Sequence, residues 1–169
     1  MHHAGAVRKD LSDLFVSNDE VFGAVKRSPK LLAGISIHPA RPDALDELER
    51  CAAAGAVLLK LLPCVQNVDC NLTKYKMFWT RLADLGLPLL AHTGGEFFVR
   101  SCRNDLKSPL CLRLPLECGV TVIAAHCSTR ALPIRNPLEK KIELTRALGF
   151  PERVFTDLWD LIPILRLAA

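Results

Sequence analysis

The sequence predicts an α/β fold in which about five parallel strands alternate with helices, as in an incomplete (β/α) barrel. Five short apolar runs each end on a polar side chain, and helical signals precede each run. The spacing of the last four ends is even, with 32 positions from 60 to 92, 34 from 92 to 126 and 31 from 126 to 157. A βαβ unit has about this length. The predicted strands are residues 32–38, 56–62, 88–92, 120–126 and 153–157, and the polar residues at or near their ends are His38, Lys60, His92, His126 and Asp157.

The first two predicted helices have recognisable ends. One begins at Asn18 and stops before Pro29, so that it leads into the first strand. The second covers residues 43–54, with Pro42 at its start and Gly55 just past its end, an asymmetry typical of helices. The strand that follows begins directly after this glycine.

A loop and a glycine turn are predicted around the third strand. Residues 63–71 form a loop long enough to lie across the mouth of a barrel, and the next helix passes through Phe78 and ends at Gly86. After the strand at 88–92, Gly94 lets the backbone approach a ligand closely. We therefore expect Gly94 and the nearby Glu96 to bind substrate, although a simple turn and a solvated carboxylate are the alternatives.

The last third of the chain continues the pattern. Ser108 starts a helix that Pro115 is expected to kink or shorten. Another helix is predicted over 136–149, and a final one near the end is weakened by Pro163. With no low-complexity linker in the sequence, residues 1–169 are predicted to form one partial barrel domain.

Composition limits the class of protein. The 169 residues are 50% hydrophobic, which suits a sheet that is buried on both faces. An eight-unit barrel takes about 250 residues, so the chain is short by roughly three units. The net charge of +4 comes from scattered basic residues, and aromatic residues make up only 6%. We therefore expect a small-molecule substrate and no nucleic-acid partner.

The alternative fold is a flavodoxin-like open sheet, which the periodic pattern of apolar residues does not exclude.

The seven cysteines are odd in number and form no CxxC pair. This usage predicts free thiols in a reducing compartment. Cys127 is expected to point away from its neighbour His126 and to pack as a small residue. No stretch reaches the roughly 18 apolar residues of a membrane span, and the amino terminus has no secretory apolar core. These features predict a cytoplasmic protein without a membrane partner.

Two strand-end histidines are the main candidates for chemistry. On neighbouring parallel strands, His92 and His126 would lie about 4.8 Å apart along the sheet. Strand alternation is expected to place Leu90 on the face of His92, and Val122 and Ala124 on the face of His126. Two imidazoles so placed can bind one divalent metal ion, most readily zinc.

The other strand ends have weaker functional interpretations. Lys60 shares a face with the histidines, where a neutral amine would bridge metals as a carbamate, act as a base or anchor substrate. Its alternative is a packed stem with the ammonium in solvent. His38 is either a substrate contact or a loop residue. Asp157 is either a carboxylate ligand or base, or a helix N-cap.

Four stretches carry a resemblance to a known family. They are GISIHP at 34–39, GAVLLKLLP at 55–63, LPLLAHTG at 87–94 and GVTVIAAHC at 119–127. Together they resemble the metal-dependent amidohydrolase superfamily, with most similarity to the branch that contains aminocarboxymuconate-semialdehyde decarboxylase-like enzymes. The resemblance implies a TIM-type barrel with metal ligands on strands one, five, six and eight.

In that resemblance, His92 and His126 match the ligands on strands five and six. Lys60 matches the strand-four position that some members use as a carboxylated lysine, and Asp157 falls on strand seven. The chain would then cover strands three to seven. The strand-one His-x-His pair is missing, because His2 and His3 are adjacent.

The resemblance implies a hydrolase in which metal-activated water attacks the carbonyl, ester or amide of a small molecule, with Lys60 and Asp157 as catalytic candidates. A catalytic zinc normally has three protein ligands, and this chain offers two, so we expect weak or no activity alone. One alternative is a decarboxylase of the same branch. The other is a non-catalytic metal-binding protein that self-associates as a homo-oligomer through open sheet edges.

Overall fold

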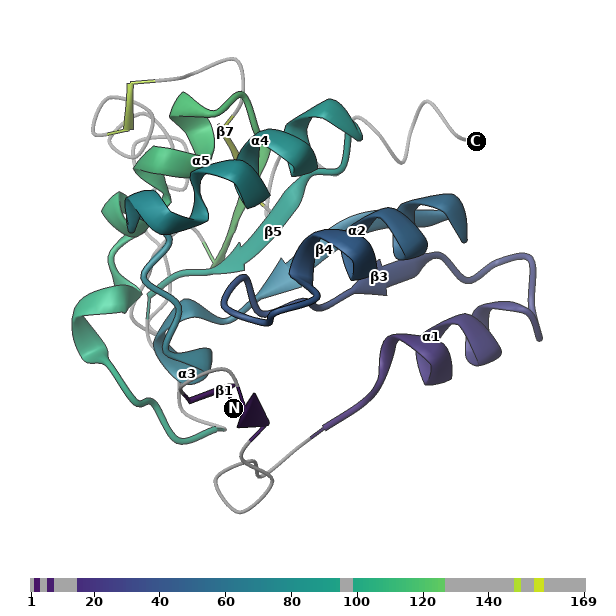
Figure 1. Cartoon of the computed structure of the whole chain (residues 1–169). Helices are drawn as coiled ribbons and strands as arrows, with labels where there is room; N and C mark the ends of the chain where they lie inside the picture. The colour runs from purple at the N-terminus through teal and green to yellow at the C-terminus, as the bar shows by residue number, and fades with distance from the viewer. Residues whose placement is uncertain are drawn as a thin grey trace.

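A five-stranded parallel sheet organises the chain (Figure 1). The computed structural model describes residues 2–3, 6–7, 15–94, 99–126, 148–149 and 154–156. The strands are β3 (Ala33–Ile35), β4 (Ala56–Leu61), β5 (Leu89–His92), β6 (Val122–Ala125) and β7 (Val154–Thr156). They pair in chain order, β3-β4-β5-β6-β7. A flavodoxin-like sheet would instead have the order 2-1-3-4-5. The sequential order confirms the predicted α/β fold of an incomplete barrel with five parallel strands.

A second, smaller sheet was not predicted. β1 (His2–His3) pairs antiparallel with β2 (Ala6–Val7), and His2 lies opposite Val7 in the register. This pair is separate from the parallel sheet.

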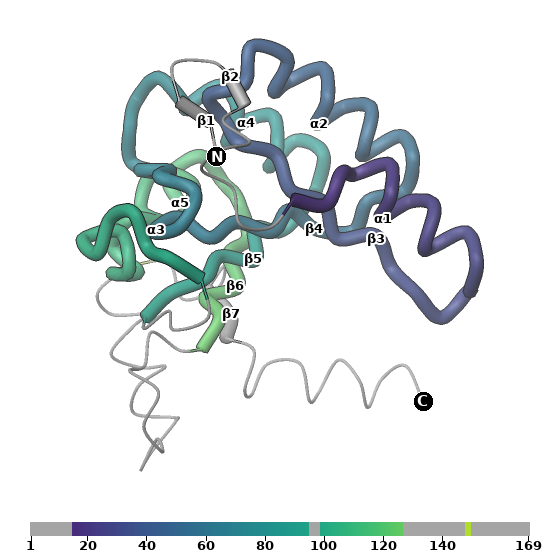
Figure 2. Tube along the Cα trace, turned by 90° about the horizontal axis from the view of Figure 1, so that it is seen from below, coloured from purple at the N-terminus to yellow at the C-terminus, as the bar shows by residue number. Residues whose placement is uncertain are grey.

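Helices α2 and α4 lie along one side of the parallel sheet, as Figure 2 shows, and α1 lies beside its β3 edge (Figure 1). The α-helices are α1 (Asn18–Val25), α2 (Ala44–Ala53), α3 (Pro63–Gln66), α4 (Lys76–Asp84) and α5 (Arg113–Glu117). The 3₁₀-helices are η2 (Thr73–Tyr75), η3 (Asn104–Lys107) and η4 (Pro109–Leu112). Within the described ranges, no helix has both the length and the apolar character needed to cross a membrane.

The core lies between the sheet and these helices. Alternate strand residues are buried in one cluster with α2, α4 and α5, and each fully buried leucine contributes about 1.5–3 kcal/mol. The cluster includes Leu59, Leu61, Leu89, Ala91, Val122 and Ala124 from the strands and Leu48, Trp79, Leu82 and Leu116 from the helices. The other strand positions, Leu58, Lys60, Leu90 and Ile123, are only half-buried and face away from this core.

The ends of α1 and α2 follow their sequence signals. Ser17 and Glu20 form a capping box at the start of α1, in which the Ser17 hydroxyl accepts from the Glu20 N–H at 3.2 Å and the Ser17 N–H donates to the Glu20 carboxylate at 2.7 Å. Gly55 has a φ of 90° just after α2, where the chain turns into β4. Both helices therefore confirm their predicted positions.

Two segments differ from expectation. Residues 63–71, predicted as a loop, begin with the short helix α3, because Pro63 stands at a position where its missing N–H costs no hydrogen bond. The helix expected from Ser108 is divided into η4 and α5, and Pro115 lies in the first turn of α5. The predicted helix over 136–149, apart from 148–149, and the final helix near Pro163 lie outside the described residues.

Candidate functional site

Lys60, the second-last residue of β4, and His92, the last residue of β5, share the face of the sheet opposite the core helices. In the parallel register, Lys60 pairs with Leu90, and Leu90 pairs with Ile123. Their strand neighbours on either side are buried against the helices, so alternation places Lys60, Leu90 and His92 on the other face. The predicted shared face of Lys60 and His92 is therefore confirmed.

His92 is the last residue of β5 and lies opposite Ala125 in the ladder. Its side chain is buried, with 6% of its surface exposed. The sheet therefore holds this imidazole at a fixed point on the edge where β5 and β6 end.

His126 also lies at this edge of the sheet, but its backbone is not in the strand conformation that was predicted. β6 ends at Ala125, and Val122 and Ala124, which were expected on the face of His126, belong instead to the helix-facing core. His126 has a φ of 63°, in the left-handed region, which turns the chain out of strand geometry. The prediction from alternation was wrong for β6, because alternation no longer applies after the strand ends.

The two imidazoles nevertheless lie side by side. Their ring centroids are 4.8 Å apart, and the ring planes meet at 62°. Unlike His92, His126 is exposed, so the pair has one buried and one accessible member. The sequence predicted this pairing, and the structure brings the two residues together.

Paired imidazoles are suitable donors for a zinc ion, which prefers nitrogen and sulfur ligands. In the described part of the chain, no group of three or more histidine, cysteine, aspartate or glutamate side chains is placed to bind a metal. The pair would therefore supply two ligands, and a third would come from elsewhere. Asp157, which follows β7, lies outside the described residues.

Lys60 is half-buried in β4. Its ladder partner Leu90 is two residues before His92, so Lys60 lies one side-chain layer deeper than the histidine on the same face.

His38 is buried and hydrogen bonded through both ring nitrogens. Nδ1 accepts from the Ala40 N–H at 3.1 Å, which leaves the proton on Nε2, and Nε2 donates to the Gln66 carbonyl at 3.1 Å. These bonds tie the end of β3 to α3. They favour a structural role for His38, and its predicted substrate contact stays a prediction.

Gly94 is buried and has a φ of 88°, a conformation that favours glycine. Its N–H donates to the Lys107 carbonyl at 2.8 Å, so this donor already has a partner within the chain. Glu96 lies outside the described residues. The substrate-binding roles of both residues stay predictions.

Sequence reasoning did not single out Thr93. This residue follows His92, is fully buried, and donates a hydrogen bond from its hydroxyl to the Ala125 carbonyl at 2.7 Å. The hydroxyl thus joins the ends of β5 and β6. Its position directly after a strand-end histidine was the signal that could have identified it.

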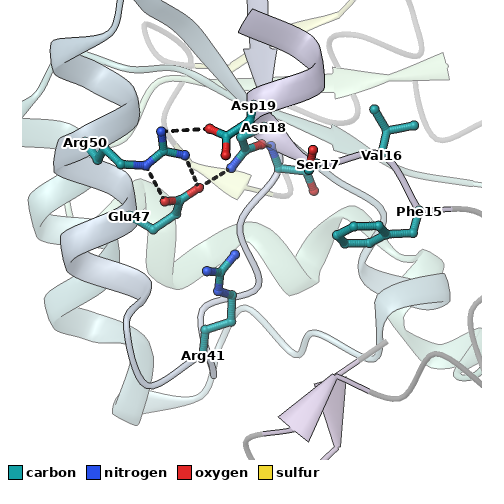
Figure 3. A pocket seen from close by; sticks show the side chains of 9 residues that line it. Phe15, Val16, Ser17, Asn18, Asp19, Arg41, Glu47 and Arg50 are labelled. Atoms are coloured by element: carbon teal, nitrogen blue, oxygen red, sulfur yellow. Dashed lines mark hydrogen bonds and ion pairs between the residues drawn. The ribbon is translucent and has the colours of Figure 1, made fainter. Parts of the chain in front are cut away.

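A pocket of about 420 Å³ lies at the start of α1 and beside α2 (Figure 3). Its lining includes Asn18, Ser36, Arg41, Glu47 and Arg50, and none of the predicted site residues. The guanidinium of Arg41 is paired with Asp43.

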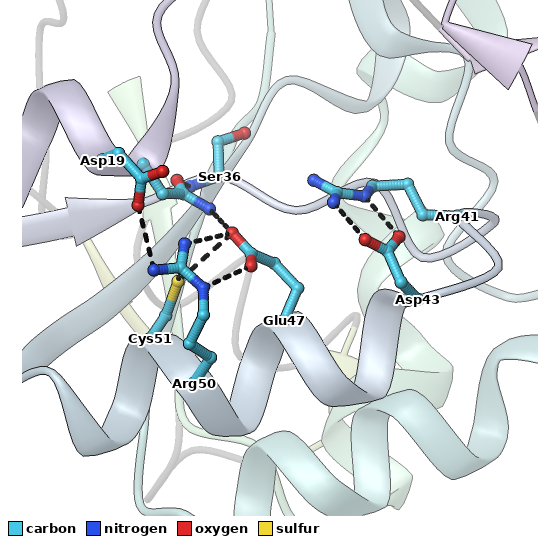
Figure 4. A network of polar contacts seen from close by, with 8 residues as sticks. Asp19, Ser36, Arg41, Asp43, Glu47, Arg50 and Cys51 are labelled. Carbon is cyan, nitrogen blue, oxygen red and sulfur yellow. Dashed lines mark hydrogen bonds and ion pairs between the residues drawn. The ribbon is translucent and has the colours of Figure 1, made fainter.

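A polar network at this pocket joins α1, α2 and the segment after β3 (Figure 4). Asn18 donates to Glu47 at 2.8 Å and accepts from the Ser36 N–H at 3.0 Å. Arg50 bonds to Glu47 at 2.7 Å and to Asp19 at 2.9 Å. Hydrogen bonds from Arg50 and Asn18 outweigh desolvation and lower the pKa of Glu47 to about 2. This network is a structural clamp, because each charged group in it already has a partner.

Comparisons with known proteins agree with this fold. The profile described as amidohydrolase matches residues 4–160. A solved structure from Pseudomonas putida, designated a 2-pyrone-4,6-dicarboxylic acid hydrolase, is similar with a TM-score of 0.51 and 16% sequence identity. The match covers 85% of this chain, which spans 63% of the length of that protein. No curated protein matches the chain significantly. At this identity the structural likeness concerns the fold.

Proposed function

Because the chain belongs to the amidohydrolase family, we propose that it provides part of the active site of a metal-dependent hydrolase. The reaction would be the cleavage of an ester or amide bond in a small molecule by water. The observation that carries the proposal is the His92 and His126 pair, with ring centroids 4.8 Å apart where two parallel strands end. The name of the similar Pseudomonas protein, a dicarboxylic acid hydrolase, favours substrates that carry carboxylates.

In this proposal, His92 and His126 hold a divalent metal, most readily zinc. When bound, such an ion would lower the pKa of water from 15.7 to about 7 and polarise a carbonyl group. The buried imidazole of His92 sets the position of the pair, and the exposed imidazole of His126 leaves the site open to ligands.

Lys60 and Asp157 have the remaining roles. The Lys60 ammonium, on the face of His92, would bind a substrate carboxylate, or as a carbamate would bridge metals. Asp157 would accept the proton of the attacking water. Oxygen from water then adds to the carbonyl carbon, the bond to the leaving oxygen or nitrogen breaks, and the proton passes to the leaving group.

Hydrolysis of p-nitrophenyl acetate by the purified chain, with added zinc or with a chelator, tests the proposal. We expect slow zinc-dependent hydrolysis that falls at least about tenfold in His92→Ala and His126→Ala, because each variant loses one ligand. Glu49→Gln, which changes an exposed residue of α2 that pairs with Arg81, is the control and should keep the wild-type rate.

The outcomes separate the candidate functions. Zinc-dependent hydrolysis that disappears in both site variants supports the hydrolase. Zinc binding without turnover would favour a non-catalytic metal-binding protein. A rate that is equal with zinc and chelator, and unchanged in both variants, would overturn the proposal.

A further inference from the structure

We infer that Thr93 is a positioning residue that holds His126 in the orientation that places its imidazole beside that of His92. This inference rests on the proposed function, because it concerns the same histidine pair. It adds a residue that neither touches substrate nor binds metal, and that acts only through the backbone of its neighbour.

The hydrogen bond of Thr93 acts at the peptide that precedes His126. Its hydroxyl donates to the Ala125 carbonyl at 2.7 Å, and this carbonyl belongs to the peptide bond between Ala125 and His126. Thr93 is fully buried, so water does not compete for the bond. The bond therefore fixes the orientation of the peptide bond that joins Ala125 to His126.

The backbone of His126 needs such a restraint. The β5–β6 ladder ends at the pair of His92 and Ala125, so regular strand pairing stops one residue before His126. His126 then has a φ of 63°, which residues other than glycine seldom adopt and which persists when the surroundings determine it. The Thr93 hydroxyl bonds to the carbonyl of Ala125, the last residue of the ladder before this turn.

Thr93 also links the two histidines directly. It is bonded covalently to His92, and through its side chain it holds the peptide of His126. Its hydroxyl therefore couples the position of one ring to that of the other. A residue with only a packing role would need the shape of threonine but not its hydroxyl.

Three variants separate these roles. Thr93→Val keeps the shape and removes the hydroxyl, and Thr93→Ser keeps the hydroxyl and removes the methyl group. Thr121→Val is the matched control, because Thr121 is a half-buried threonine that precedes β6 at the opposite end of the strand.

The measurement is the nuclear Overhauser effect between the ring protons of His92 and His126 in the metal-free protein. Assignment uses His92→Gln and His126→Gln. We expect a cross-peak in wild type, Thr93→Ser and Thr121→Val, and its loss in Thr93→Val. Zinc titration should show a dissociation constant about tenfold or more higher in Thr93→Val than in wild type.

An undiminished cross-peak and unchanged zinc affinity in folded Thr93→Val would overturn the inference. If Thr93→Val does not fold, Thr93→Ser is compared with Thr93→Ala, which differ in the hydroxyl alone, and equal cross-peaks in these two would overturn it. A wild-type cross-peak without zinc binding would contradict the proposed function and leave the role of Thr93 standing.

Discussion

At the scale of single residues, His38 and His92 are both buried but have different neighbours. Both ring nitrogens of His38 are bonded to the backbone, to Ala40 and to Gln66. His92 instead lies beside another imidazole. Burial alone therefore does not distinguish the two histidines, whereas the groups that surround each ring do.

His38→Phe tests the structural role of His38. The change fills the space but leaves the Gln66 carbonyl and the Ala40 N–H without their partner, so we expect the free energy of unfolding to fall by about 2 kcal/mol. Urea denaturation measures this loss, and zinc affinity should not change. A variant of wild-type stability that has lost hydrolysis would instead favour the substrate contact predicted from the sequence.

The sequence predicted that β5 ends at His92, but β3 ends at Ile35, before His38, and β6 ends at Ala125, before His126. The pairing of His92 with His126 follows from strand spacing, because neighbouring parallel strands end at one edge. The left-handed backbone of His126 and the bond from Thr93 depend on contacts between segments that lie 32 residues apart. The local sequence draws attention to Thr93, but it does not give the partner of its hydroxyl or the φ of His126.

At the scale of elements, the clamp of Asn18, Glu47 and Arg50 joins α1 to α2. Asn18 contributes through both ends of its amide, since it bonds to Glu47 and to the backbone of Ser36 after β3. Glu47 is shielded, with only 13% of its side chain exposed, whereas Arg50 is 47% exposed. Solvent therefore partly screens the ion pair, and the hydrogen bonds provide much of the stabilisation.

Glu47→Gln should lower the free energy of unfolding by about 1–2 kcal/mol at neutral pH. The pKa of Glu47 is about 2 in the folded chain, below its ordinary value of 4.5, so its stabilisation is complete above about pH 4.5. The difference in the free energy of unfolding between wild type and variant should therefore decrease as the pH falls from about 4.5 towards 2.

The control for this clamp is Glu49→Gln. Glu49 is 55% exposed and pairs with Arg81 at the surface, so its loss should change stability by less than about 0.5 kcal/mol. Urea denaturation across the pH range measures both variants. A Glu47→Gln effect that grew on acidification would contradict the depressed pKa.

Helix ends were predictable from the sequence where a single residue type marks them. Helix α1 begins at Asn18 as predicted, although the cap is formed by Ser17 and Glu20, which were not singled out from the sequence. Gly55 follows α2 as predicted. The helix α3 inside an expected loop was missed, since four residues give no periodic pattern. The clamp was also missed, because Asn18 and Glu47 are 29 residues apart.

At the scale of the whole molecule, the sequential order of five parallel strands places the site. Helices cover one side of the sheet, and the half-buried residues Leu58, Leu90 and Ile123 lie on the other with Lys60. In a barrel this second side becomes the interior, and the carboxyl ends of the strands carry the active site. That is where His92 and His126 meet, so the fold and the proposed chemistry agree.

The central claim is that His92 and His126 bind one metal ion together. Native mass spectrometry of the chain with zinc tests it most directly, because the spectrum reports zinc per chain and the state of assembly at once. We expect one zinc per chain in wild type and loss of that zinc in His92→Ala and in His126→Ala, since neither imidazole suffices alone. Zinc retained at wild-type occupancy in both variants would contradict the claim.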